Sequence, residues 1–243
     1  MTSAAAAVAP RARRGFGQWF LVAIAAIVVF GFSHSVDKAL IRPSRPANPI
    51  LYLHLLLSSS WLALMIVQAG LIRRSDLRTH RRIGVWGLGL GALVALVSLI
   101  VVFVMRRQDI ALHPGDPSRI AFLAIPLESF LGFAAPFAVA ALWRKRADIH
   151  RPMMMLAACG LTPAAMVRVP WLGHGPWVSV IYLGLMLLAT AEDALRRRRL
   201  SPAYLIGVPS LIVVAQGANY LGFHGPPAWT ALARILLALP HGS

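Results

Sequence analysis

Long apolar stretches, separated by short polar loops, run along almost the whole chain. The hydrocarbon core of a bilayer is about 30 Å thick, so a helix needs about 20 apolar residues to cross it. Seven stretches meet or approach that length, at residues 15–35, 49–72, 83–105, 120–143, 152–170, 171–191 and 200–223. The fifth is short, and only a tight turn separates it from the sixth. The pattern therefore predicts an all-α fold, a polytopic transmembrane helix bundle of about seven spans.

The two ends of the chain differ from this middle part. Residues 1–14 are rich in Ala and Arg and form a basic flank, whereas residues 15–223 make up one transmembrane domain. In the last part, residues 224–243, the apolar run is too short to span a bilayer and carries Arg234. We expect this C-terminal segment to be a short interfacial or re-entrant helix.

Composition agrees with a membrane protein. Hydrophobic residues make up 58% of the chain and charged residues only 13%, about half the charged fraction of ordinary soluble domains. The net charge of +16 could suggest nucleic acid, but the basic residues fall in short runs between apolar stretches rather than on one polar surface. We therefore expect no nucleic acid partner. The single cysteine, Cys159, excludes a C-x-x-C-H haem attachment motif.

The basic runs predict how the chain lies in the membrane. They stand in the N-terminal flank and in the second-to-third, fourth-to-fifth and sixth-to-seventh loops, which together carry 16 of the 24 Lys and Arg residues. Loops rich in Lys and Arg stay in the cytoplasm. This predicts a bacterial inner membrane protein with a cytoplasmic N-terminus and, after seven spans, an outer C-terminus. We expect anionic lipid headgroups to contact the basic loops. The sequence also leaves open whether the chain binds another membrane protein or forms a homo-oligomer.

A polar stripe follows the second stretch. His54, Trp61 and Gln68 are spaced by seven residues, so successive members drift only about 20° around an α-helix. The rest of the helix is mainly aliphatic and suits lipid, so the stripe should face the bundle interior. Two interpretations are open. The polar members form hydrogen bonds between helices, or they contact a ligand or cofactor.

Glu128 is the only acid deep inside an apolar stretch. A lone carboxylate there is costly, so it is either protonated or paired with a cation. His54, Arg168 and His34 are candidate partners at compatible depth, and His34, His54 and Glu128 together are a candidate metal site. Glu128 then either fixes helix register in a buried ion pair or serves a function. We also expect Arg168 to be part of the polar interior.

His80 and His150 start the third and fifth stretches at the same predicted depth, and an Arg follows each. Two histidines at equal depth on different helices are the geometry of bis-histidine haem ligation. Both also suit a simpler role as headgroup anchors at the membrane boundary. Haem b is therefore a possible cofactor, with His54, His80, His150 and Glu128 as the candidate cofactor-binding residues.

Several of these motifs together resemble an uncharacterised family of bacterial multi-pass membrane proteins. They are His54…Trp61…Gln68, His80-Arg81-Arg82-Ile83-Gly84, His150-Arg151 and the basic loop from Asp193 to Pro202. The resemblance covers residues 50 to 205 and implies no particular activity. A looser similarity is to b-type membrane cytochromes, which hold haem between histidines of neighbouring helices. This chain departs from them in having Glu128 and no histidine in its fourth stretch.

Three functions are consistent with these patterns. The first is a haem- or metal-binding membrane redox protein, and the second is a transporter or small-ligand binder that uses Glu128 and Arg168. The third is a non-catalytic accessory subunit of a membrane complex. The sequence contains no phosphate-binding Gly loop, no His-Glu-x-x-His and no Gly-x-Ser-x-Gly. Whether the chain is an enzyme therefore stays open at this point.

Overall fold

The computed structural model describes residues 11–43, 46–173 and 176–239, and the regular structure in these ranges is entirely helical. The elements are α1 Arg11–Ser33, η1 Asp37–Ile41, α2 Pro49–Arg73, α3 Leu77–Leu112, α4 Pro117–Ala121, α5 Ala124–Leu142, α6 Ala147–Cys159, α7 Thr162–Met166, α8 Trp177–Arg197, α9 Pro202–His224 and α10 Pro227–Leu236. Among the described residues, six helices are long and apolar enough to cross a membrane. The all-α multi-pass bundle predicted from the apolar pattern is confirmed.

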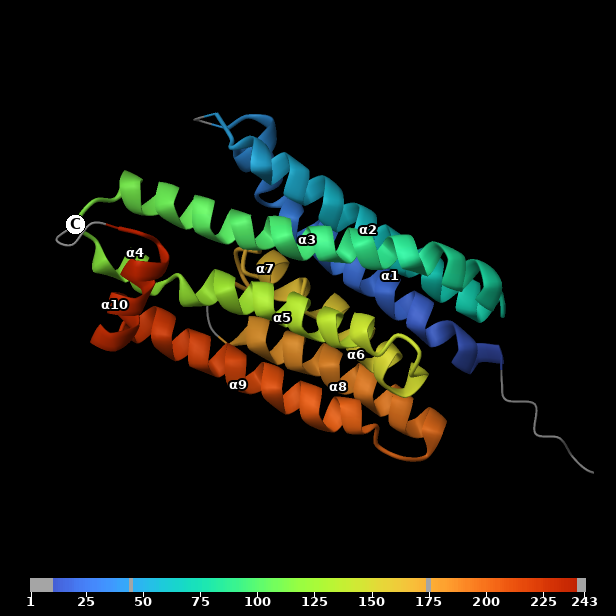
Figure 1. Ribbon diagram of the computed structural model, residues 1–243. Coiled ribbons are helices and arrows are strands. Elements are labelled where there is room, and N and C mark those ends of the chain that lie inside the picture. The colour runs from blue at the N-terminus through green and yellow to red at the C-terminus, as the bar shows by residue number, and fades with distance from the viewer. Residues whose placement is uncertain (1–10, 44–45, 174–175, 240–243) are drawn as a thin grey trace, which may run out of the picture.

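The helices run side by side, so that the loops gather at two opposite ends of the bundle (Figure 1). The start of α1, the α2–α3 loop, the α5–α6 loop and the α8–α9 loop lie at one end. Three of the basic runs sit in these loops and the described part of a fourth lies at the start of α1, so we call this the basic end. The α3–α4 loop and α10 lie at the other end.

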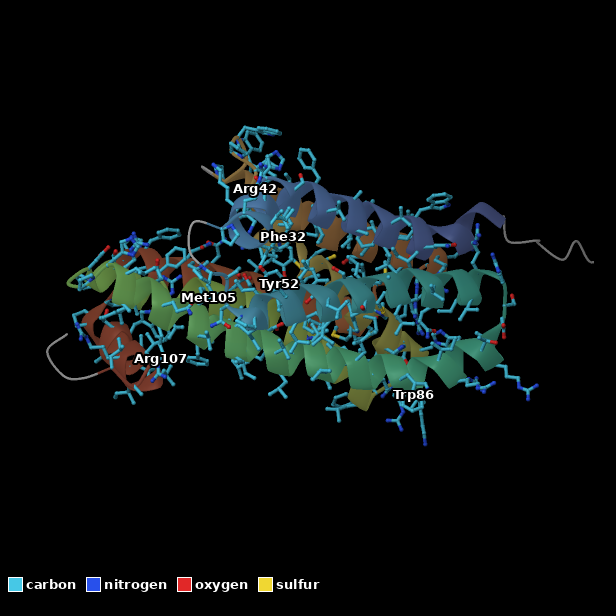
Figure 2. The ribbon with its side chains drawn as sticks, turned by 90° about the horizontal axis from the view of Figure 1, so that it is seen from above. Phe32, Arg42, Tyr52, Trp86, Met105 and Arg107 are labelled. Carbon is cyan, nitrogen blue, oxygen red and sulfur yellow. The ribbon has the colours of Figure 1, made fainter. Side chains whose placement is uncertain are left out.

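The outer surface of the bundle is apolar, as contact with lipid requires. Trp86 on α3 is 80% exposed and points away from the bundle (Figure 2). Exposed Leu, Ile, Val and Phe side chains cover the outer faces of α2, α8 and α9 in the same way. In a soluble protein so much exposed apolar surface would drive aggregation. This surface supports an integral membrane protein.

The predicted fifth span is not one helix. It is α6, which ends at Cys159, followed after two residues by the five-residue helix α7. Pro163 has no backbone N–H and so cannot donate to the carbonyl of Cys159 four residues earlier. The hydroxyl of Thr162 donates to that carbonyl instead, at 2.8 Å. Freed carbonyls in membrane helices are often satisfied by such a Thr hydroxyl, and here it stabilises a break in the chain.

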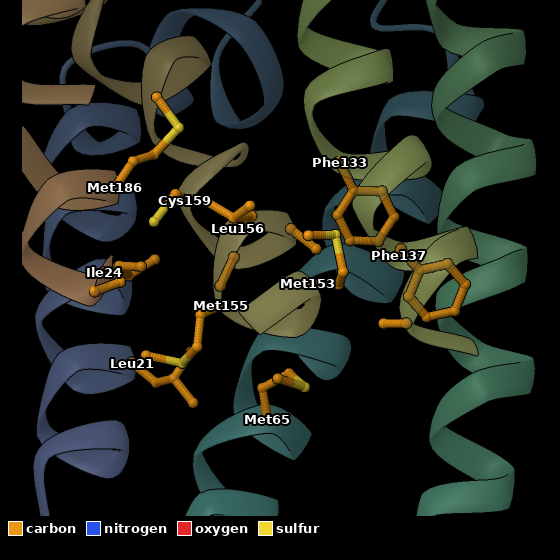
Figure 3. Close-up of a cluster of buried hydrophobic side chains, with 14 of the residues drawn as sticks. Leu21, Ile24, Met65, Phe133, Phe137, Met153, Met155, Leu156, Cys159 and Met186 are labelled. Atoms are coloured by element: carbon orange, nitrogen blue, oxygen red, sulfur yellow. The ribbon is translucent and has the colours of Figure 1, made fainter. Parts of the chain in front are cut away.

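Helix α6 nevertheless lies in the centre of the bundle. Met153 and all residues from Met155 to Cys159 are buried. Figure 3 shows Met155 beside Leu21 of α1 and Met153 beside Phe133 and Phe137 of α5. A broken helix can therefore persist here because protein, and not lipid, surrounds it.

The helices α5 and α6 touch through backbone atoms. A Cβ atom added at Gly160 would collide with the carbonyl oxygen of Gly132 and would come within 2.9 Å of the Phe133 nitrogen. Gly31 of α1 makes a similar approach to the backbone of Ala165 in α7. Small residues permit such close packing in membrane bundles. The break after α6 is thus clamped between α1 and α5.

The C-terminal segment folds back on the end opposite the basic end. Its helix α10 has ten residues, and Ala233 and Leu237 are buried against Val102 of α3, Ile120 of α4 and Leu123. Arg107 of α3 donates to the carbonyl of Leu237 at 2.6 Å, and Figure 2 places Arg107 beside this segment. The expected short helix is therefore present, whereas residues 1–10 and 240–243 lie outside the described part of the chain.

Candidate functional site

A small polar cavity of about 110 Å³ lies beside the break between α6 and α7. Its walls come from α5, α7 and the residue that follows it, α8 and α9. The lining residues are Ile125, Glu128, Ser129, Pro163, Ala164, Val167, Val178, Ser179, Tyr182, Ala215 and Asn219. A water in the liquid occupies about 30 Å³, so the cavity has room for a few waters or for one small solute.

The cavity lies toward the end opposite the basic end. Asn219 is five residues before the last residue of α9, His224, and Ser179 is the third residue of α8. At 1.5 Å rise per residue, Asn219 lies roughly 8 Å from the end of its helix. The cavity is thus inside the apolar part of the bundle but within reach of its surface.

Glu128 has no cationic partner in the described part of the chain. Its nearest polar contact is the hydroxyl of Ser129, which donates to Oε2 across a long 3.5 Å. The sequence left two alternatives for this acid, a proton or a cation. Since no side chain of the described residues supplies the cation, the structure favours a neutral Glu128 or one that takes its counter-charge from a ligand.

Tyr182 of α8 places a second polar group close to Glu128. The residue is 5% exposed, and its buried hydroxyl has no hydrogen-bond partner within the described part of the chain. A Cβ atom added at Gly132 would lie 3.5 Å from this hydroxyl and 3.9 Å from Oε1 of Glu128. The acid and the hydroxyl therefore flank the same glycine. Buried polar groups are almost always hydrogen-bonded, so an orphan hydroxyl beside a free acid indicates a place for a ligand or water.

The polar stripe of α2 faces inward in part. Trp61 and Gln68 are buried, whereas His54 is half-buried. Trp61 packs edge-on against Phe133, with ring centroids 4.9 Å apart. Nδ1 of His54 lies 3.4 Å from the hydroxyl of Ser98 in α3, at the long limit of a hydrogen bond. His54 does not line the Glu128 cavity, so the stripe binds α2 to α3 and α5 rather than completing that site.

Arg168 and His34 differ from the prediction. Arg168 is exposed, its guanidinium lies 4.5 Å from the ring centroid of Phe32, and it donates to the carbonyl of Ala164. It forms no ion pair with Glu128. His34 is also exposed, and its Nδ1 lies 2.9 Å from the carbonyl of Phe30. Neither residue forms the expected pair with Glu128, because each finds a partner in or beside its own helix.

The candidate metal site of His34, His54 and Glu128 is not assembled. Among the described residues, no three His, Cys, Asp or Glu side chains converge closely enough to hold a metal ion. The three residues belong to different parts of the bundle, because His34 ends up outside, His54 faces Ser98, and Glu128 faces the cavity.

The two histidines at the basic end hold matching positions. His80 is the fourth residue of α3 and His150 is the fourth residue of α6, and both helices begin at this end. Nδ1 of His150 lies 2.9 Å from the carbonyl of Ala140, which leaves Nε2 free. The amide of Gln68 satisfies its neighbours when its nitrogen faces the Nδ1 of His80 at 2.5 Å and its oxygen accepts from the Gly84 nitrogen at 3.1 Å. Gln68 thus links α2 to the start of α3.

A buried ion-pair network at the same end was not predicted. Asp193 of α8 is fully buried, and its Oδ1 accepts from Arg151 at 2.7 Å, Arg196 at 3.1 Å and Arg197 at 2.9 Å. Glu192 accepts from Arg151 at 2.5 Å. The network joins α6 to α8. The signal in the sequence was the pair of acids within an otherwise basic run, which marks them as partners for nearby arginines.

The uncharged polar residues of the cavity were also missed. Ser129, Ser179, Tyr182 and Asn219 are isolated polar positions in apolar helices. Each is common in membrane helices as a hydrogen-bonding group between neighbours. The spacing of Ser179 and Tyr182 could have predicted that these two residues belong together. They are three residues apart, so they share a face of one helix.

Comparison of the chain with protein-family models, with curated proteins and with solved structures finds no match.

Proposed function

We propose that this multi-pass membrane protein is a transporter that takes up a small cationic solute at Glu128. One observation carries the proposal. Glu128 lines a cavity inside the apolar bundle and has no cationic side-chain partner among the described residues, and the buried hydroxyl of Tyr182 beside it has no hydrogen-bond partner among them. A cation entering the cavity would supply the charge that Glu128 lacks. Intramembrane acids in bundle interiors commonly mark ion and solute pathways.

The polar lining supports recognition of a solute that donates hydrogen bonds. Glu128 offers two carboxylate oxygens, and Tyr182, Ser179 and Asn219 offer further oxygen acceptors from α8 and α9. A small ammonium ion satisfies several of these acceptors at once, since it carries several donors around one charge. The size of the cavity favours a compact ion over a drug-sized molecule.

The break between α6 and α7 supports transport over simple binding. Pro163 and Ala164, at the start of α7, form part of the cavity wall. Transporters often build their solute sites from interrupted helices near the middle of the membrane. This part of the wall lies where α6 has ended and α7 begins, so no continuous hydrogen-bond ladder runs through it. A shift of the wall would therefore break no such ladder.

Thermal unfolding of the detergent-purified protein tests the proposal. The probe is methylammonium chloride, compared with sodium chloride at equal ionic strength. We expect methylammonium to raise the melting temperature of the wild type in a concentration-dependent way, because a ligand of the folded state stabilises it. Glu128→Gln should abolish the rise, and Tyr182→Phe should reduce it. Tyr220→Phe, an exposed tyrosine of α9 outside the cavity, is the matched control.

Uptake of labelled methylammonium into vesicles that contain the protein then separates transport from binding. Uptake that depends on Glu128 supports the transporter. A melting shift that depends on Glu128, without uptake, would leave a binding protein and remove transport. A wild type whose melting does not respond to either cation would contradict the proposed site.

Haem binding is the second candidate, and the matching positions of His80 and His150 at the starts of α3 and α6 favour it. His150 is better suited than His80 to be a haem ligand. Nδ1 of His150 contacts the carbonyl of Ala140. In metal-bound histidines the ring nitrogen that does not bind the metal commonly makes such a contact, which orients the ring and leaves Nε2 for the metal. In His80, an Nδ1 that accepts from Gln68 places the ring proton on Nε2, so that nitrogen would have to lose its proton first.

A visible absorption spectrum tests this second candidate. Protein purified after expression with sufficient haem should show a Soret band, and His150→Ala should remove it. His113→Ala is the control, since His113 is exposed at the end of α3, the end away from the basic loops. A folded but colourless preparation would exclude haem ligation by these residues.

A further inference from the structure

A long apolar groove lies on the surface of the bundle, separate from the Glu128 cavity. It has a volume of about 440 Å³, which is within the range of about 300–1,000 Å³ that is typical of ligand pockets. Residues of α5, α6, the loop between them and α9 line it, among them Ala135, Trp143, Arg146, Leu156 and Gly207. None of these residues lines the Glu128 cavity.

The groove has an apolar body and a charged mouth. Its body is lined almost entirely by carbon, with Ser210 as the only uncharged polar side chain other than Trp143. Small residues, among them Ala135 of α5 and Gly207 of α9, give the groove its depth. Gly207 lies against the floor, because a Cβ atom added there would come within 2.7 Å of Leu156. The body therefore fits a hydrocarbon chain.

The mouth opens at the basic end of the bundle. Arg146 lines it and forms an ion pair with Asp148 at 3.0 Å. Arg144 and Lys145 precede Arg146 and are exposed, and Arg197 reaches the carbonyl of Ala147 at 3.5 Å. Two acids, Asp148 and the Arg197 partner Asp193, stand among these four basic side chains, so the mouth keeps an excess of positive charge and attracts an anion. Trp143 lines the groove just inside this mouth, where tryptophans commonly sit at the level of lipid headgroups.

We propose that the groove is a binding site for one anionic phospholipid. One acyl chain lies between α5 and α9 on the floor formed by α6, and the phosphate lies at Arg146 and its basic neighbours. The charge and the apolar body specify the occupant together. A second protein helix would fill the body but leave the basic mouth without an anion, and a free phosphate would leave the body empty.

Native mass spectrometry of the detergent-purified full chain tests this site. The probes are phosphatidylglycerol and phosphatidylcholine with identical acyl chains. We expect phosphatidylglycerol to remain bound under conditions that remove phosphatidylcholine. Arg146→Gln should lower the phosphatidylglycerol adduct about fivefold, which corresponds to about 1 kcal/mol for one basic residue at an anionic surface. Arg78→Gln, which removes an exposed charge of the α2–α3 loop region, should leave the adduct unchanged.

Filling the groove gives an independent check. Ala135→Phe places a ring in the body and should remove most of the adduct, whereas Ala138→Phe, on an exposed position of α5 outside the groove, should not. A third measurement uses the fluorescence of Trp143, which lines the groove. Phosphatidylglycerol with brominated chains should quench the fluorescence of the wild type more than that of Trp143→Phe. Equal binding of both lipids, equal effects of both alanine variants, or equal quenching would overturn the proposal.

Discussion

Asp193 and Glu128 are both buried or half-buried acids of the bundle, but their surroundings are opposite. Asp193 is fully buried, and Arg151, Arg196 and Arg197 all donate to its Oδ1. Glu128 faces a cavity and has only the hydroxyl of Ser129 at 3.5 Å. An acid surrounded by arginines holds helices together. An acid that lines a cavity and has no cationic partner among the described residues is available to a ligand.

The two acids also differ in how readily their surroundings could change. The Asp193 network links α6 to α8 at the basic end, where Arg151 bridges Asp193 and Glu192. The Glu128 cavity lies against the break between α6 and α7, where the helical ladder is already interrupted. The comparison therefore separates an end of α6 that ion pairs hold from an end where the helical ladder is interrupted and backbone contacts hold the chain.

The largest effect should come from Asp193→Asn. This change keeps the shape of the side chain but leaves Arg151, Arg196 and Arg197 without their shared carboxylate. Breaking a buried ion pair from one side costs about 3–5 kcal/mol, and we expect the lower end of that range because the arginines are partly exposed. Thermal unfolding in detergent measures the loss. Asp37→Asn, in the exposed pair with Arg42, should change stability by less than about 1 kcal/mol.

A smaller loss is expected from Gly160→Ala at the break. The new Cβ would meet the backbone of Gly132, which cannot move aside as a flexible side chain can. Overpacking of this kind costs about 1–3 kcal/mol. Gly184→Ala in α8 is the matched control, because no atom lies within 4 Å of its added Cβ. In that exposed helical position Ala should stabilise by up to about 1 kcal/mol. Opposite signs in unfolding would support the close contact of α5 and α6, and equal signs would oppose it.

Arg168→Gln should have a still smaller effect. The guanidinium stacks on Phe32 and carries no salt bridge to Glu128. A cation–π contact at an exposed site is worth about 0.5–1 kcal/mol. The double variant Glu128→Gln with Arg168→Gln should lose the sum of the two single losses, since independent sites add. Recovery of stability in the double variant would show that the two residues are paired after all.

The apolar pattern predicted the bundle, because the length of a membrane helix follows from bilayer thickness. It placed both ends of α2 and α9 within two residues, whereas both ends of α3 and α8 lie six or seven residues from the predicted positions. It missed the break between α6 and α7. Pro163 alone does not decide a break, since membrane helices tolerate proline, and the deciding features are the Thr162 hydroxyl bond and the backbone contact of Gly160. The seven-residue stripe predicted the burial of Trp61 and Gln68 correctly, because burial follows helix periodicity.

The partners of polar residues were harder to predict than their burial. Glu128 stood out by charge, but its neighbours Tyr182 and Asn219 come from α8 and α9, which are distant in sequence. The expected pairing with Arg168 assumed that equal depth implies contact. Depth is only one coordinate of a side chain, and the rotation of its helix is the other. The five residues of α7 are too few for a periodic pattern that would predict this rotation.

The free energy of unfolding of Glu128→Gln, measured beside Asp193→Asn under identical conditions, tests most directly whether the two acids have different roles. The account predicts that Glu128→Gln stays within about 1 kcal/mol of the wild type, as a change that breaks no ion pair should, whereas Asp193→Asn falls by about 3 kcal/mol. A loss for Glu128→Gln as large as that for Asp193→Asn would contradict it, because Glu128 would then be a structural acid with a buried partner.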